Sequence, residues 1–122
     1  MISTYGKFVR LLKLEIESLH DEVEIILQSL DARLANHEIT DYVRNENGAV
    51  LRNELLGLED ILCTELDLED RDQASVDEIA EAARACIKRR MKERDYVPAL
   101  YDLVDGRIAK IVTYLRSPVA AR

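Results

Sequence analysis

An apolar heptad pattern through the first thirty residues constrains the fold more than any other feature of this chain. Apolar side chains recur there at alternating steps of three and four residues, at Tyr5, Val9, Leu12, Ile16, Leu19, Val23, Ile26 and Leu30. This spacing places them along one face of an α-helix, which is typical of bundles and coiled coils. Ser3 is suited to cap the first turn, and Asn36 and His37 to end the last. The pattern predicts a long helix over residues 3–35.

The next stretch, residues 38–66, also has helical spacing. Its leucines form a stripe at Leu51, Leu55, Leu58, Leu62 and Leu66. The segment Asn45–Gly48 precedes this stripe, and asparagine and glycine both disfavour a helix interior. We therefore expect a second helix over residues 38–66, with a kink or short break near Asn45–Gly48.

Two start signals mark the remaining helices. Ser75 and Glu78 have the spacing of a capping box, in which each side chain satisfies a free backbone N–H of the first turn. Pro98 is favourable in a first turn and disruptive inside a helix. These two signals predict helices over residues 76–94 and 99–116. Together the patterns predict an all-α four-helix bundle that forms a single domain over residues 1–122.

Charge and hydropathy indicate where the protein is located and which kinds of partner it is not expected to bind. No apolar run approaches the roughly 20 residues that a membrane span needs, and residues 1–14 lack the pattern of a signal peptide. We expect a cytoplasmic protein that does not enter membranes. The net charge of −7 repels phosphates, so nucleic-acid binding is not expected. The one basic cluster, residues 88–94, ends the predicted third helix, where cations offset the helix dipole.

A second apolar stripe lies on the first helix, away from the heptad seam. Leu11, Leu14 and Ile25 form it. A helix that packs only along one seam does not need these side chains. Neighbouring helices of the same bundle could cover them, or they could contact a second copy of the chain or another protein. We predict an interaction surface at these three residues.

The metal-binding motifs that the sequence suggests are incomplete. Glu17 and His20 have the ExxH spacing of di-iron bundles, but such sites need a second ExxH, and His37 has Leu34 in the corresponding position. The acidic stretch 67–72 lacks the glycine and the final glutamate of a calcium-binding loop. We expect no catalytic residue, no metal ligand and no cofactor.

The function that fits best is therefore a non-enzymatic protein that acts through protein–protein interaction or self-association into a homo-oligomer. One alternative is an acidic inhibitor, such as an immunity protein or antitoxin, that masks a basic partner. Another is a small metal-binding or hydrolytic all-α enzyme. Glu54 would be the starting point of such a site, because it falls between Leu58 and Ile61 on the inward face of its helix.

Overall fold

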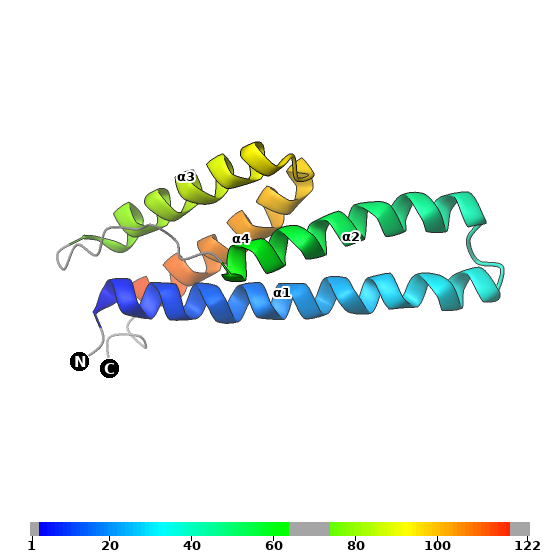
Figure 1. Cartoon of the computed structure of the whole chain (residues 1–122). Helices are drawn as coiled ribbons and strands as arrows, with labels where there is room; N and C mark the ends of the chain where they lie inside the picture. The colour runs from blue at the N-terminus through cyan, green and yellow to red at the C-terminus, as the bar shows by residue number, and fades with distance from the viewer. Residues whose placement is uncertain (1–2, 64–73, 118–122) are drawn as a thin grey trace.

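The computed structural model describes residues 3–63 and 74–117. They form four helices and no strand, in the order α1 (Thr4–Ala35), α2 (Asp41–Cys63), α3 (Val76–Arg94) and α4 (Pro98–Arg116). The predicted all-α four-helix bundle is confirmed (Figure 1). In the part of the chain that the structure describes, none of these helices has the length and hydropathy to cross a membrane.

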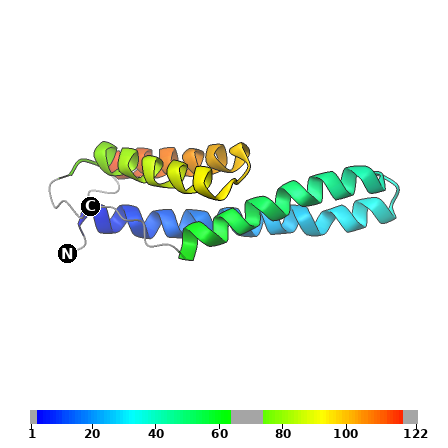
Figure 2. The ribbon, with the colours of Figure 1, turned by 45° about the horizontal axis from the view of Figure 1, so that its top comes forward.

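The helices pair as two antiparallel hairpins of unequal length. Helix α1 has 32 residues, about 48 Å, whereas α3 and α4 have 19 each, about 28 Å. The α3–α4 hairpin lies against the first part of α1 and the last part of α2. The turn between α1 and α2 extends well beyond it in both views (Figures 1 and 2).

The turn between α1 and α2 determines where α2 begins. His37 is left-handed (φ 60°), its N–H bonds to Leu34 O, and Glu38 N–H bonds to Arg33 O. These bonds satisfy the last free carbonyls of α1. Thr40 Oγ1 then accepts from Val43 N–H. The second helix consequently starts at residue 41, and the expected start at 38 is wrong; its expected end at 66 lies outside the described residues.

Helix α2 passes through Asn45–Gly48 without a break, since residues 41–63 are helical throughout. Gly48 is buried there although its neighbours in that segment are exposed. A Cβ at position 48 would lie 3.1 Å from the guanidinium of Arg52, which is one turn further along the same helix. The expected kink or break near Asn45–Gly48 is not seen as an interruption of the helix.

The predicted starts of the last two helices are confirmed, but only the Ser75 half of the capping box forms, because Glu78 binds the Ser75 hydroxyl and not the Ser75 backbone N–H. Glu78 N–H donates to Ser75 Oγ, and the Ser75 hydroxyl donates to Glu78 Oε1, each at 3.2 Å. Pro98 stands in the first turn of α4. Between the two helices, Asp95 adopts the left-handed conformation (φ 55°), and Tyr96 N–H bonds to Met91 O.

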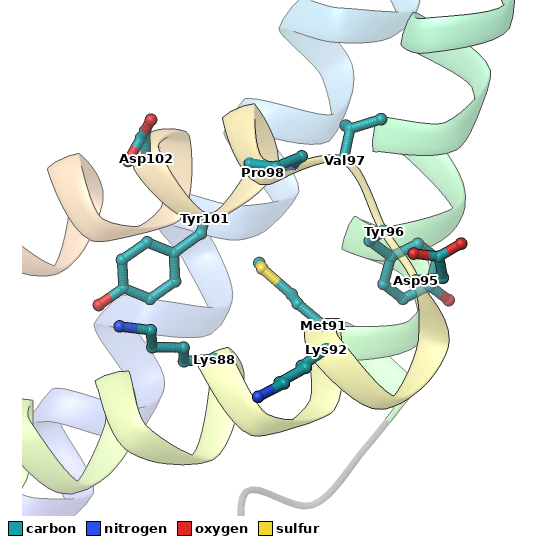
Figure 3. Close-up of a pocket in the computed structure, with 9 residues that line it drawn as sticks. All are labelled: Lys88, Met91, Lys92, Asp95, Tyr96, Val97, Pro98, Tyr101 and Asp102. Carbon is teal, nitrogen blue, oxygen red and sulfur yellow. The ribbon is translucent and has the colours of Figure 1, made fainter.

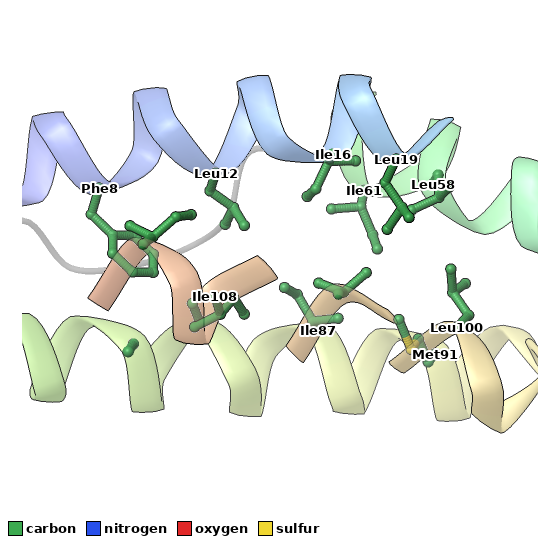
Figure 4. Close-up of a cluster of buried hydrophobic side chains, with 14 of the residues drawn as sticks. Phe8, Leu12, Ile16, Leu19, Leu58, Ile61, Ile87, Met91, Leu100 and Ile108 are labelled. Atoms are coloured by element: carbon green, nitrogen blue, oxygen red, sulfur yellow. The ribbon is translucent and has the colours of Figure 1, made fainter. Parts of the chain in front are cut away.

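The core lies where the two hairpins overlap (Figure 4). The heptad seam supplies Leu12, Ile16, Leu19 and Val23 to it. Helices α3 and α4 contribute mainly Ile79, Ala83, Ile87, Leu100, Val104, Ile108 and Ile111. Phe8 is fully buried, although it lies outside the seam. Ile26 belongs to the seam but is 51% exposed, so its expected burial is wrong.

Hydrogen bonds and ion pairs hold the α3–α4 hairpin on the α1–α2 hairpin. Arg107 donates to Glu15 (2.8 Å) and Glu22 (2.6 Å) and so joins α4 to α1. Asp60 of α2 accepts from Arg90 Nη2 (2.9 Å) and from the Tyr96 hydroxyl (3.0 Å). These contacts hold the α3–α4 turn against the last two turns of α2.

The closest approach of α4 to α2 occurs at Gly57, and it gives the first prediction. A Cβ at position 57 would overlap Cδ2 of the fully buried Leu100. We expect Gly57→Ala to lower the free energy of unfolding by about 1–2 kcal/mol, because overpacking outweighs the gain in helix propensity. Gly106→Ala is the control: a Cβ there meets nothing, and about 0.5–1 kcal/mol should be gained. Urea unfolding measures the stability of both variants, and equal effects of the two substitutions would contradict the close packing of Leu100 on Gly57.

Asp60 gives a prediction for acid unfolding. Burial opposes its ionisation, but hydrogen bonds from Arg90 and Tyr96 and the charges of Arg90 and Arg94 outweigh burial and lower the pKa of Asp60. Its stabilising contribution is therefore complete above the unfolded-state pKa of about 3.9 and disappears as the pH falls through the folded-state pKa. Asp60→Asn should cost about 1 kcal/mol at pH 7 and less at pH 3. A loss that is the same at both pH values would be inconsistent with this ion pair.

Candidate interaction surface

The α3–α4 hairpin stops covering α2 near Gly57. Residues seven apart in a helix lie almost in line, so Val43, Val50 and Gly57 form one row along α2. Leu100 of α4 packs on Gly57, and Asn53 accepts the Val97 backbone N–H at 2.9 Å. Beyond these contacts the row is exposed: Val50 by 43% and Val43 by 36%.

A row of residues on α1 also changes from buried to exposed where the α3–α4 hairpin ends. Leu12, Leu19 and Ile26 form a row at steps of seven residues. Leu12 and Leu19 are buried and point toward α3 and α4 in Figure 4. Ile26 comes two turns further, where the shorter hairpin has ended, and is half exposed.

We define the distal face as Ile26 of α1 together with Val43, Glu46 and Val50 of α2. It continues the surface on which α3 and α4 pack, and no described element covers it (Figures 1 and 2). Three of the nine large apolar side chains that are exposed among the described residues, Ile26, Val43 and Val50, belong to this face. Such a concentration of exposed apolar groups is typical of a binding surface, whereas single exposed leucines are not.

This end of the molecule is also acidic. Residues 21–56 contain eight carboxylates and three arginines, which is a charge of −5 out of the total of −7. One of these carboxylates, Glu22, is paired with Arg107 of α4. Two of the arginines are already paired close to the turn, Arg44 with Asp31 (2.7 Å) and Arg33 with Glu38 (3.4 Å). Glu46 has no ion pair among the described residues. The distal face therefore has a negative potential.

Glu54 lies on α2 one turn from Val50, at the inner edge of the distal face. It is only 7% exposed, as its inward position on the helix predicts. Within residues 3–63 and 74–117 it makes no hydrogen bond or ion pair, yet its carboxylate oxygens keep contact with solvent. Burial without a partner raises its pKa. No second carboxylate of these ranges joins it in a metal-binding group.

The predicted stripe of Leu11, Leu14 and Ile25 is divided by the structure. Leu11 is partly buried against α4, beside a hollow of about 250 Å³ that Ile111 and Tyr114 also line. Leu14 and Ile25 are 53% and 66% exposed. Leu11 thus contributes to the bundle, and an interaction through Leu11, Leu14 and Ile25 stays a prediction.

A second hollow, of about 440 Å³, lies at the α3–α4 turn (Figure 3). Met91, Val97 and Tyr101 form its apolar lining. Lys88 extends over the Tyr101 ring, with Nζ 5.7 Å from the ring centre, and Lys92 borders the same space. The carboxylates Asp95 and Asp102 also line the hollow, so its two lysines are balanced and its charge does not favour an anionic ligand. The hollow is open to solvent, and its lining residues contain no nucleophile paired with a base.

His20 is the centre of a small cluster on α1. Its Nε2 lies 3.0 Å from Glu59 Oε1, and its Nδ1 lies 3.7 Å from Glu24 and 3.9 Å from Asp21. Glu17, the other half of the ExxH spacing, is not part of the cluster. His20, Asp21 and Glu24 could contact a cation, but two of these three ligands are exposed carboxylates. The hydrogen bond to Glu59 gives His20 a structural role, because it joins α1 to α2.

Comparison of the chain with protein-family models, with curated proteins and with solved structures finds no match. The candidate surface therefore rests on the geometry of the chain itself. Sequence reasoning did not find Val43 and Val50, because apolar spacing in α2 does not indicate which rows α4 is long enough to cover.

The unpaired carboxylate at the edge of the distal face gives a prediction. Because burial raises the pKa of Glu54 above its ordinary value of 4.5, its charged form is less favourable in the folded chain than in the unfolded one. We expect Glu54→Gln to raise the thermal midpoint at pH 7. The gain should vanish below pH 4.5, where the carboxyl is neutral in both states. Glu17→Gln, at an exposed position of α1, is the control and should change little at either pH.

Proposed function

We propose that this protein acts by binding another protein through the distal face. The observation that supports this most directly is the exposure of Ile26, Val43 and Val50 on rows whose inner members are buried under α3 and α4. The chain thus presents the surface of a helix-binding bundle without the helices that would complete it. Burying these side chains would gain free energy at about 25 cal/mol per Å² of apolar area.

The acidity of residues 21–56 supports a second, related reading, an inhibitor-type protein that masks a basic surface on its partner. A face of one sign accelerates the encounter with a partner of opposite charge and disfavours others. The two readings share one surface and differ only in what binding does to the partner. An enzymatic role finds less support, because the His20 cluster and the hollow at the α3–α4 turn each lack a nucleophile with its base.

Site-specific photocrosslinking tests this proposal. A photoreactive phenylalanine analogue is placed at Val50, at Ile26, at Leu14 or at Ala109 of α4, and the chain is expressed and irradiated in its native host. We expect adducts of one common mass from positions 50 and 26, because one partner covers both. Ala109 is exposed on the opposite hairpin and should give none.

The same experiment separates the two apolar surfaces of α1. Adducts from Leu14 without adducts from Val50 would move the interaction to the stripe of Leu14 and Ile25 and refute the distal face. Adducts of equal yield from all four positions would indicate unspecific contact and would also refute it.

A further inference from the structure

We infer that the partner segment received by the distal face is a basic amphipathic helix of about four turns. This inference rests on the proposed function and adds the chemistry of the partner. Three properties of the surface lead to it: its length, its charge and its small area.

The length of the surface suits a single helix. Helix α1 exceeds α3 and α4 by about 13 residues, so about 20 Å of the α1–α2 hairpin extends past the shorter hairpin. A third helix packs on two adjacent helices by laying its own apolar ridge along their exposed apolar residues, here Ile26 of α1 and Val43 and Val50 of α2. A helix of about 14 residues has this length.

The charge selects a basic helix. Glu46 lies between Val43 and Val50 on the exposed side of α2, and Glu54 follows at the inner edge. Neither has a cationic partner among the described residues, and Glu54 retains solvent contact at its oxygens. Glu46 and Glu54 are eight residues apart on α2, about 12 Å, so two lysines or arginines flanking the apolar ridge of the partner would pair with them, one with each carboxylate. An acidic helix would add like charges to a region that already carries −5.

A second copy of the chain fits this surface less well. The free part of the hairpin is about 20 Å long and two helices wide, which gives a few hundred Å² on each partner. Stable dimers bury about 800 Å² per partner. Joining two distal faces would also bring together two acidic ends without supplying a cation to Glu54.

Peptide binding tests the inference on the full chain. Two fluorescein-labelled peptides of 14 residues carry the same leucine ridge at helical spacing, one flanked by lysines and the other by glutamates. Fluorescence anisotropy measures their affinities at low and at physiological salt. We expect the lysine peptide to bind at least about tenfold more tightly, with an affinity that falls as salt is added.

Variants of the chain show where the peptide binds. Val50→Asp should abolish binding, and Val43→Asp serves as a second test because both positions are solvent-exposed and tolerate charge. Glu46→Gln with Glu54→Gln should weaken the lysine peptide about tenfold. Glu17→Gln with Asp102→Asn removes the same charge from exposed positions elsewhere and should weaken it less than about twofold. Circular dichroism confirms that each variant remains folded.

Different outcomes refute the two proposals separately. Equal binding of both peptides, or equal effects of the two charge pairs, would overturn the basic helix. Crosslinks at Val50 would still support the distal face as a binding surface in that case. A dimer in native mass spectrometry that Val50→Asp dissociates would also overturn the basic helix, because the occupant would then be a second copy.

Discussion

The contact between Gly57 of α2 and Leu100 of α4 determines where the bundle ends. Because position 57 has no side chain, α4 can begin directly on the surface of α2, and Asn53 and Asp60 hold Val97 and Tyr96, the two residues that precede α4. Helix α4 then runs back along α1 to the end near Thr4, a distance that its 19 residues just span. The starting point of α4 therefore divides the α1–α2 hairpin into a covered part and a free part.

The two parts differ in what stabilises them. In the covered part, side chains of four helices share one core, and Arg107, Glu15 and Glu22 fasten its surface. In the free part, α1 and α2 have only each other, and Leu30 is the buried apolar side chain that lies outside the shared core. Two helices bury less apolar surface per residue than four. The free part is consequently the less stable end of the hairpin, and an added helix would stabilise it most.

The helices themselves could be predicted because local patterns determine them. The heptad seam, the capping box at Ser75 and the position of Pro98 placed α1, α3 and α4 almost to the residue. The start of α2 was missed because it depends on the left-handed His37 and on the cap at Thr40. The distal face was missed for a different reason. Apolar spacing places Ile26 on the face of α1 that is expected to be buried. Only the lengths of the helices and the residue at which α4 begins show that no described helix covers it. The predicted helix lengths, about 33 residues against 19 and 18, contained that signal.

Glu54 connects the stability of the fold to its proposed use. The residues one and two turns further along the same face, Leu58 and Ile61, are buried apolar side chains, and an apolar residue at 54 would serve the bundle better than an unpaired carboxylate. The carboxylate lowers the stability of the free chain at neutral pH, because burial raises its pKa. On the proposed function it would also disfavour contact of the exposed valines with a neutral apolar surface, since such contact would desolvate the charge. A partner that supplies a cation at this position removes that cost, so the residue that weakens the isolated fold is the one that distinguishes a basic helix from other apolar occupants.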